Sequence, residues 1–143
     1  MSKQFFPSLN HIFMLCFAFA LSACHTVQKH HAYITNQGDH TVSVINTDNQ
    51  QLIDTIKSGK APVGVAISAK LQRVYISNVE SQDITVINTA NQKVIDSIKI
   101  QGSPVGLTLS PDSRILYVAD WFDNRVLAIN TQNKSDIRIL QVG

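Results

Sequence analysis

The sequence predicts an all-β fold built from repeated four-stranded sheets, and three observations support this prediction. Tyr33, Tyr75 and Tyr117 are spaced 42 residues apart, as expected for an internal repeat. Each period contains short runs rich in Val, Ile and Tyr, separated by Asn, Asp, Gly, Ser and Pro. No window has apolar residues at helical spacing over a length that would form a helix.

Other motifs recur at the same spacing. The sequence Val-Ile-Asn-Thr occurs at residues 44–47 and 86–89, and its variant Ala-Ile-Asn-Thr occupies 128–131. Pro-Val-Gly occurs at 62–64 and again at 104–106. No insertion is needed to align the copies from Tyr33 to Gly143. The repeat therefore covers almost the whole chain after its N-terminal segment.

The middle copy shows the expected order of strands most clearly. It predicts strands over 64–68, 73–78, 83–89 and 93–100, with polar turns between them. In the first copy, Tyr33 opens the second strand, so only three strands are expected there. The three copies together then supply 3, 4 and 4 strands.

This period matches one blade of a β-propeller, a ring of four-stranded antiparallel sheets. The run Ile84, Thr85, Val86, Ile87 is apolar on both faces of its strand, as expected when sheets stack face to face. We expect blades at about 32–63, 64–105 and 106–143, which is about 2.75 blades.

The repeats resemble the Tyr-Val-Thr-Asn (YVTN) family of β-propeller proteins. The resemblance rests on Ala-Tyr-Ile-Thr-Asn at 32–36, Val-Tyr-Ile-Ser-Asn at 74–78 and Leu-Tyr-Val-Ala-Asp at 116–120. Ser-Pro-Asp-Ser at 110–113 stands where the family usually has Ser-Pro-Asp-Gly, and residues 68–71 lack this turn. The resemblance implies an extracytoplasmic propeller. It implies little about activity, since family members have varied roles.

Fewer than three full blades do not close a ring, because propellers contain about 4–8 blades. The outer faces of the first and last blades would then be uncovered. Each face would lose on the order of 10 kcal/mol of stabilising free energy from apolar burial, at about 25 cal/mol/Å². We therefore expect that a C-terminal segment is missing from this sequence. The alternative is self-association, in which two or more chains complete one ring.

The N-terminus has the pattern of a bacterial lipoprotein signal peptide. An apolar run at 12–20 is too short for the roughly 20 residues that cross a bilayer, and Leu-Ser-Ala-Cys follows at 21–24. We expect a signal peptide over 1–23, a lipid on the thiol of Cys24 and a tether over 24–31. By resemblance to known sorting rules, His25 favours the outer membrane. The alternative is an ordinary secretory signal with a chance cysteine.

Composition excludes several classes of function. The formal net charge is only +2, which argues against a nucleic-acid-binding domain. Two cysteines cannot form a four-thiolate metal site, and the adjacent imidazoles of His30 and His31 do not converge in an extended tether. We expect no metal and no cofactor.

The best candidate site is a loop in the third copy, between its second and third strands. The loop contains the only Trp, beside a Phe, an Arg and carboxylates: Asp120, Trp121, Phe122, Asp123 and Arg125. Since strands alternate in direction, the equivalent loops and the Pro-Val-Gly loops should share one rim. Trp and Arg are frequent hot-spot residues. The alternative is that Trp121 and Phe122 pack on the neighbouring blade while Arg125 pairs with Asp123.

No catalytic constellation is evident. His40 is a lone loop histidine, and Asp54 and Asp96 occupy one repeat position suited to a solvated or turn-bonded role. The sequence therefore favours a non-catalytic binding or scaffold module whose partner is a protein, a peptide or a glycan. The alternatives are a propeller enzyme (lactonase-like or tetrapyrrole-binding) and a structural surface-layer component.

Overall fold

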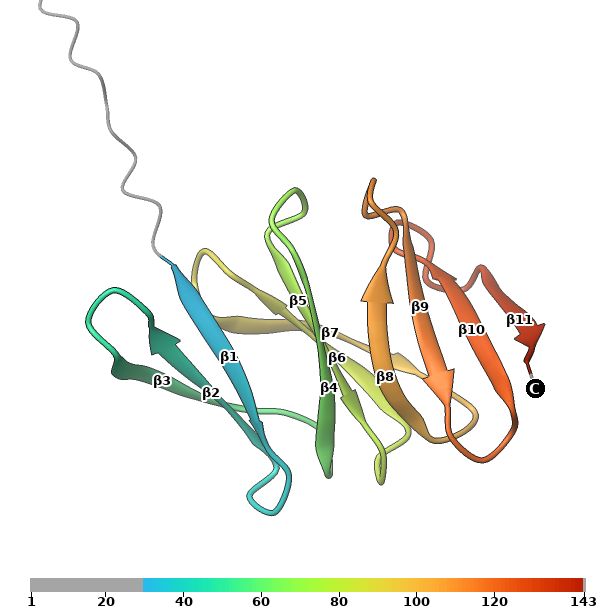
Figure 1. Ribbon diagram of the computed structural model, residues 1–143, viewed down its shortest axis with the longest axis horizontal. Helices are drawn as coiled ribbons and strands as arrows, with labels where there is room; N and C mark the ends of the chain where they lie inside the picture. Colours follow the sequence, from blue (N-terminus) through green and yellow to red (C-terminus); the bar gives the residue numbers. More distant parts are fainter. Residues whose placement is uncertain (1–29, 143) are drawn as a thin grey trace, which may run out of the picture.

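The computed structural model describes residues 30–142, and all regular structure there is β (Figure 1). Its strands are β1 His31–Asn36, β2 Thr41–Asn46, β3 Gln51–Lys57, β4 Pro62–Ser68, β5 Arg73–Asn78, β6 Asp83–Asn88, β7 Lys93–Lys99, β8 Pro104–Leu109, β9 Ile115–Asp120, β10 Arg125–Asn130 and β11 Ile137–Gln141. The predicted all-β class and the number of strands are confirmed. Strand β1 begins at His31, and each inner strand begins at the proline of Pro-Val-Gly, two residues earlier than expected.

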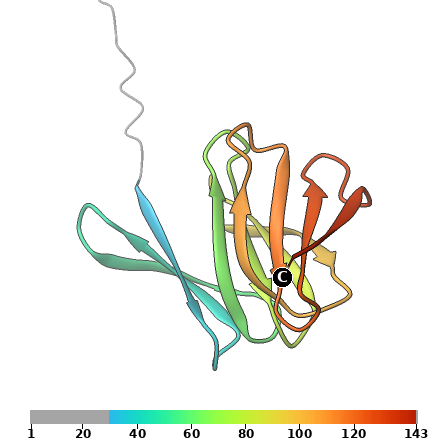
Figure 2. The ribbon, with the colours of Figure 1, turned by 45° about the vertical axis from the view of Figure 1, so that its right-hand side comes forward.

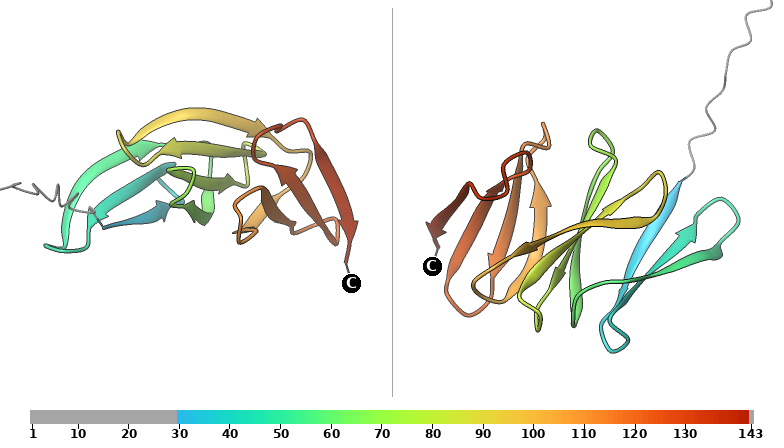
Figure 3. Two further views of the ribbon diagram at one scale, coloured as in Figure 1. Left: turned by 90° about the horizontal axis from the view of Figure 1, so that it is seen from above. Right: turned by 180° about the vertical axis from the view of Figure 1, so that it is seen from behind.

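The strands form three antiparallel sheets, which we call blades 1, 2 and 3. Blade 1 has the order β1-β2-β3, blade 2 has β4-β5-β6-β7, and blade 3 has β8-β9-β10-β11. The sheets lie side by side along an arc, with β4 and β8 on its inner side and β3 and β7 on its outer side (Figure 3). This arrangement is a segment of a β-propeller.

The turns recur with the repeat because their backbone geometry does. A residue with positive φ closes each of the hairpins β1–β2, β5–β6 and β9–β10: His40 (58°), Gln82 (53°) and Asn124 (46°). At the ends of β2 and β6, an Asn side chain accepts a backbone hydrogen bond: Asn46 Oδ1 from Asp48 N (2.8 Å) and Asn88 Oδ1 from Ala90 N (2.8 Å). Such local hydrogen bonds explain the recurring Asn-Thr pairs without a functional role.

The core lies between blades, in two apolar layers. The first contains Tyr33, Val42, Val44 and Ile56 of blade 1 and Val74, Ile76 and Ile87 of blade 2. The second contains the opposite face of blade 2 and one face of blade 3: Ala66, Tyr75, Ile84, Val86, Ile98, Ile100, Leu116, Val118, Leu127 and Ile129. Blade 2 is therefore apolar on both faces, as expected from the run at 84–87. Turning the molecule by 45° shows β8 of blade 3 close beside β4 of blade 2 (Figure 2).

The inner strands of blades 2 and 3 approach closely at Gly64. The Ser77 hydroxyl donates to the Val105 carbonyl oxygen (2.6 Å) and accepts a hydrogen bond from Gly64 N (2.8 Å). A side chain at Gly64 would collide with the Val105 carbonyl oxygen, whereas the nearest atom to a Cβ at Gly106 is Ala119 Cβ at 3.7 Å. The repeat thus requires glycine where two blades meet.

The predicted signal peptide, Cys24 and all of the tether except its last two residues lie outside the described residues. Within residues 30–142, no helix is long and apolar enough to span a membrane.

The close approach at Gly64 gives a prediction with an internal control. We expect Gly64→Ala to lower the free energy of unfolding by about 1–3 kcal/mol, because the new methyl group overpacks the contact between β4 and β8. Gly106→Ala, at the same repeat position, should change it by less than about 0.5 kcal/mol. Urea unfolding followed by circular dichroism measures both, and equal losses in the two variants would contradict this account of blade contact.

Candidate functional site

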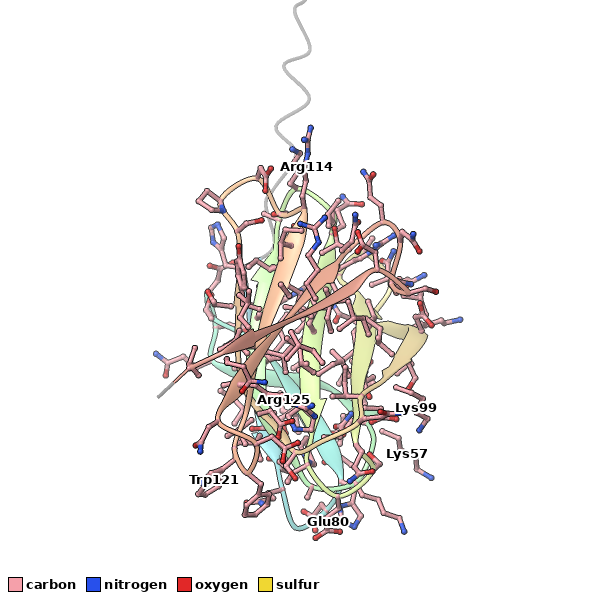
Figure 4. All side chains as sticks on the ribbon, turned by 90° about the vertical axis from the view of Figure 1, so that its right-hand side faces the viewer. Lys57, Glu80, Lys99, Arg114, Trp121 and Arg125 are labelled. Atoms are coloured by element: carbon pink, nitrogen blue, oxygen red, sulfur yellow. The ribbon has the colours of Figure 1, made fainter. Side chains whose placement is uncertain are left out.

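The candidate loop lies at one end of the blades, which we call the lower rim. The lower rim consists of the turns at 37–40, 79–82 and 121–124 and the linkers at 58–61 and 100–103. Backbone hydrogen bonds join turn to linker: Val79 N donates to Ala61 O (3.1 Å), and Trp121 N donates to Ser103 O (3.1 Å). Figure 4 shows Glu80 and Trp121 at this end and Arg114 at the opposite end. The predicted sharing of one rim therefore agrees with the geometry.

Trp121 and Phe122 form an exposed aromatic pair at the tip of the β9–β10 turn. Their side chains are 70% and 76% exposed, and their rings stack with centroids 6.1 Å apart and planes 12° apart. Gln37 and Gly38, and Val79 and Glu80, occupy the same turn positions in the other blades. Because both side chains are largely exposed, the alternative that they pack on the neighbouring blade 2 does not hold.

Asp120 anchors the turn from below. This carboxylate is 4% exposed at the end of β9, where Oδ1 accepts from Ser103 N (2.9 Å) and Oδ2 accepts from Arg125 Nε (2.9 Å). Gly102 adopts a φ of +141° beside it, and a Cβ there would collide with the carboxylate. The linker before β8 is thus shaped around the Asp120 side chain.

Arg125, the first residue of β10, anchors the other end of the turn. Its guanidinium lies 2.9 Å from Asp120 Oδ2 and 2.9 Å from Asp123 Oδ2, and it also donates to the Gln101 carbonyl oxygen. The expected pairing of Arg125 with Asp123 is therefore present. Nε and Nη2 of Arg125 therefore bond to Asp120, Asp123 and the Gln101 carbonyl, which gives this guanidinium a role in holding the loop.

The electrostatics of Asp120 follow from these contacts. Burial raises the pKa of the Asp120 carboxyl group, but the Ser103 hydrogen bond and the hydrogen bond and charge of Arg125 outweigh burial and bring the pKa below its usual value. Asp120 is therefore charged at neutral pH and serves as a structural anion.

Blade 2 builds the same corner with different residues. Asn78 stands in place of Asp120 and donates through Nδ2 to Asp83 Oδ1 (2.8 Å), while Asp83 stands in place of Arg125. Ser81 Oγ donates to the same carboxylate oxygen (2.9 Å), and Lys99 pairs with Oδ2 (3.1 Å). This network was not predicted from the sequence. The signal for it in the sequence is that Asn78 and Asp83 are replaced by Asp120 and Arg125 one repeat later, so that each copy has a polar pair at these two positions.

A shallow groove was also not predicted from the sequence. It has a volume of about 310 Å³ and runs between the outer strands of blades 2 and 3, lined by Lys99, Ile100, Gln101, Arg125, Leu127, Ile137 and Ile139. Three apolar residues of this groove, Ile100, Leu127 and Ile139, have polar counterparts at the junction of blades 1 and 2. These counterparts are Ser58, Thr85 and Ser97. The blade 3 end of the lower rim is therefore the more apolar end.

The remaining candidates have structural roles. His40 Nδ1 accepts a hydrogen bond from Ala61 N (3.0 Å), which fixes the linker before β4. Asp54 Oδ1 accepts from Thr55 N (2.7 Å), and Asp96 pairs with Lys134. Among residues 30–142, no three His, Cys, Asp or Glu side chains gather closely enough to hold a metal ion.

The anchoring of Asp120 predicts a pH-dependent stability. A carboxylate whose folded-state pKa is lowered stabilises the protein above the unfolded pKa of about 3.9, and this contribution is lost as the pH falls through the folded value. Asp120→Asn should therefore cost about 1–3 kcal/mol at pH 7 and less at pH 3.

Urea unfolding at the two pH values measures the difference. Asp123→Asn is the matched control, because this half-exposed carboxylate contacts the same guanidinium and should contribute less than about 1 kcal/mol. A cost for Asp120→Asn that is the same at pH 3 and pH 7 would contradict the assignment of Asp120 as a buried anion.

Comparison with known proteins identifies the architecture. No family model matches the sequence, and no curated protein matches it. Hydrazine synthase of Kuenenia stuttgartiensis is similar in structure (TM-score 0.68, 26% identity over 71% of this chain and 30% of that chain).

Two further structures extend this likeness. A functionally unknown protein from Desulfotomaculum acetoxidans DSM 771 gives a TM-score of 0.71 at 18% identity, over 80% of this chain and 37% of that chain. Virginiamycin B lyase from Staphylococcus aureus gives a TM-score of 0.65 at 18% identity, over 78% and 37%. The chain thus spans less than two-fifths of each of these three structures. The β-propeller-type fold is shared, and the chain presents three blades of it.

Proposed function

We propose that this chain is the β-propeller module of a YVTN-type lipoprotein of the bacterial cell envelope, anchored through Cys24, and that it binds a partner at the lower rim. The partner is a protein, a peptide or a glycan. The observation that carries the proposal is the pair of stacked rings, Trp121 and Phe122, held outward on a turn that Arg125 secures.

Trp121 and Phe122 expose aromatic area that a partner would bury. Aromatic side chains dominate interface energetics because each buries a large, stiff apolar surface. Trp121 and Phe122 already stack on one another, so little conformational freedom remains to be lost when a partner covers them. Their nearly parallel rings offer a flat surface that suits an aromatic or aliphatic side chain, or the apolar face of a sugar ring.

The anchoring below the rings supports this role. Asp120 and Arg125 fix both ends of the turn, and Gly102 lets the preceding linker close against Asp120. A turn whose two ends are held by an ion pair loses less conformational freedom when a partner covers its tip. The rings therefore form a preformed contact surface on a rigid scaffold.

The inner strands favour binding over catalysis. Pro62–Ser68 and Pro104–Leu109 line the inner side of the arc and contain no titratable side chain. In the described residues, His40 is hydrogen-bonded to the backbone rather than to a nucleophile. The virginiamycin B lyase and hydrazine synthase named above are enzymes, but their likeness to this chain is one of fold.

The proposed location rests on the N-terminal sequence. The only cysteines are Cys16 and Cys24, so the described blades contain no thiol and fold without a disulfide. Leu-Ser-Ala precedes Cys24, as in a lipoprotein box, and a multiply acylated cysteine would anchor the protein stably. His25 favours the outer membrane.

The binding proposal predicts the effect of removing the rings. Trp121→Ala with Phe122→Ala should weaken partner capture from an envelope extract by at least about tenfold, since hot-spot aromatics contribute about 2 kcal/mol or more each. The matched control is Val79→Ala with Glu80→Ala, at the same turn positions of blade 2. Quantitative mass spectrometry of the captured material is the readout for all variants, and in the wild type and the control the fluorescence of Trp121, the only tryptophan, provides a second. Unchanged capture by the Trp121/Phe122 variant would contradict the proposal.

The anchor proposal is tested separately. Labelled palmitate should be incorporated into the wild-type chain in a bacterial host, and Cys24→Ala should abolish the label. Cys16→Ala, which removes the other cysteine, should leave labelling unchanged. Labelling that persists in Cys24→Ala would contradict the assignment of this residue as the lipid site.

A further inference from the structure

We propose that the groove between the outer strands of blades 2 and 3 binds one long-chain fatty acid, with the carboxylate at the lower rim and the alkyl chain between β7 and β11. The groove has a volume of about 310 Å³ and is lined by side chains of both blades. Trp121 and Phe122 are not among these lining residues, so the inference does not depend on partner binding at the turn tip.

The groove belongs to the junction of blades 2 and 3 and not to the outer face of blade 3. Ile137 pairs with Ile129, and Ile139 pairs with Leu127. Residues directly opposite one another in an antiparallel pair lie on the same face of the sheet. Ile129 and Leu127 belong to the core layer that blade 3 shares with blade 2. Ile137 and Ile139 therefore face blade 2, and a further sheet packed on the other face of blade 3 would leave the groove open.

The lining is apolar at this junction because three residues change together. Ile100 and Leu127 are buried in the core, whereas Ile139 on β11 is 54% exposed above them. Ile100 comes from the linker after blade 2, and the other two come from blade 3. Both sides of the groove have thus exchanged a hydroxyl-bearing residue for an aliphatic one.

At the junction of blades 1 and 2, the corresponding hydroxyl groups take part in hydrogen bonds. Ser97 Oγ donates to Asp83 Oδ2 (2.9 Å), and Thr85 Oγ1 accepts from Gly59 N (3.2 Å). An apolar surface without such hydrogen bonds gains free energy when an alkyl chain covers it and displaces water. The junction of blades 2 and 3 is therefore suited to an apolar ligand, whereas the junction of blades 1 and 2 is not.

The polar lining residues all lie at one end of the groove. Lys99 is the last residue of β7, Gln101 follows it in a linker of the lower rim, and Arg125 is the first residue of β10. In Figure 4, Lys99 and Arg125 lie toward the end of the molecule that carries Trp121, away from Arg114. Ile137 lines the opposite end. A ligand with one polar end and a long apolar part matches this arrangement.

Lys99 favours an anionic group at the polar end. In the described residues, its ammonium group makes one hydrogen bond, to Asp83 Oδ2 (3.1 Å), and its side chain is 76% exposed. Two of its three N–H donors remain for a ligand. Arg125 already contacts the carboxylates of Asp120 and Asp123, so Lys99 is the cation that a ligand carboxylate would meet.

The strand register sets the length of the alkyl chain. From Arg125 to Ile129, which lies opposite Ile137, β10 advances by four residues, or about 14 Å at about 3.4 Å per residue. An extended alkyl chain of roughly ten carbons spans a similar distance, since each carbon–carbon bond is about 1.5 Å long. The ligand is therefore a single-chain carboxylic acid of about this length.

The test uses the full chain with Cys24→Ala, so that no acyl chain on the protein itself competes for the groove. Isothermal titration calorimetry measures the binding of decanoate and of decanol, which has the same chain and a neutral head. We expect saturable binding of one decanoate per chain. Decanol should bind at least about fivefold more weakly, because it lacks the charge that Lys99 attracts.

One variant tests the alkyl site. Ile139→Ser introduces the residue that blade 2 has at this position and should weaken decanoate binding by at least about tenfold, because an apolar wall of the groove is lost. Its control is Ile95→Ser, which changes a comparably exposed isoleucine of β7 outside the lining and should leave decanoate binding unchanged.

A second variant tests the head. Lys99→Gln should weaken decanoate binding by at least about fivefold and leave decanol binding unchanged. Its control is Lys57→Gln, at the same repeat position but outside the lining, which should change neither affinity.

Absence of saturable decanoate binding would overturn the proposal, as would equal affinities of Ile139→Ser and Ile95→Ser for decanoate. Equal effects of Lys99→Gln on decanoate and on decanol would overturn the assignment of the carboxylate to Lys99. Binding to phosphatidylglycerol vesicles that depends on Ile139, without binding of decanoate, would identify a lipid surface as the occupant and would overturn the proposal as well.

Discussion

The structure depends on one constraint: each sheet has two apolar faces and must be covered on both. An ordinary antiparallel sheet exposes one polar face to water, but blade 2 buries Val74 and Ile76 on one side and Tyr75 and Ile84 on the other. The hydrophobic effect therefore acts between sheets rather than within one. Stability accumulates blade by blade, and only the middle blade of the described chain has both of its neighbours.

The same constraint explains where function can reside. Because the faces of a blade pack against its neighbours, variable chemistry is left to the turns and linkers at the rims. The three lower-rim turns share a backbone geometry, with positive φ at His40, Gln82 and Asn124, yet they present different tips. The third turn carries two aromatic rings and a buried ion pair in place of the amide–carboxylate network of blade 2. A recurring frame with one altered turn is the feature on which the proposed binding role rests.

Sequence alone predicts the fold well because the repeat multiplies every local signal. The strand order, the stacking of apolar faces and the common rim all follow from residues that recur at one spacing. The detail of the candidate site was harder to predict. Side-chain exposure at Trp121 and Phe122 depends on how the turn leaves the sheet, and the burial of Asp120 depends on Gly102, which is contributed by a linker distant in sequence. The sequence offers the pairing of Arg125 with Asp123 as one alternative. The second contact of Arg125, with Asp120, is evident only from the structure.

Amide hydrogen exchange tests the central claim most directly. If burial between sheets stabilises the fold, the amides of β5 and β6, which lie in the blade covered on both sides, should exchange most slowly. The amides of the outer strands β3 and β11 should exchange faster by at least tenfold, through local opening. Protection of β5 and β6 that is no greater than that of β3 and β11 would show that each sheet is stable by itself, and would contradict the account.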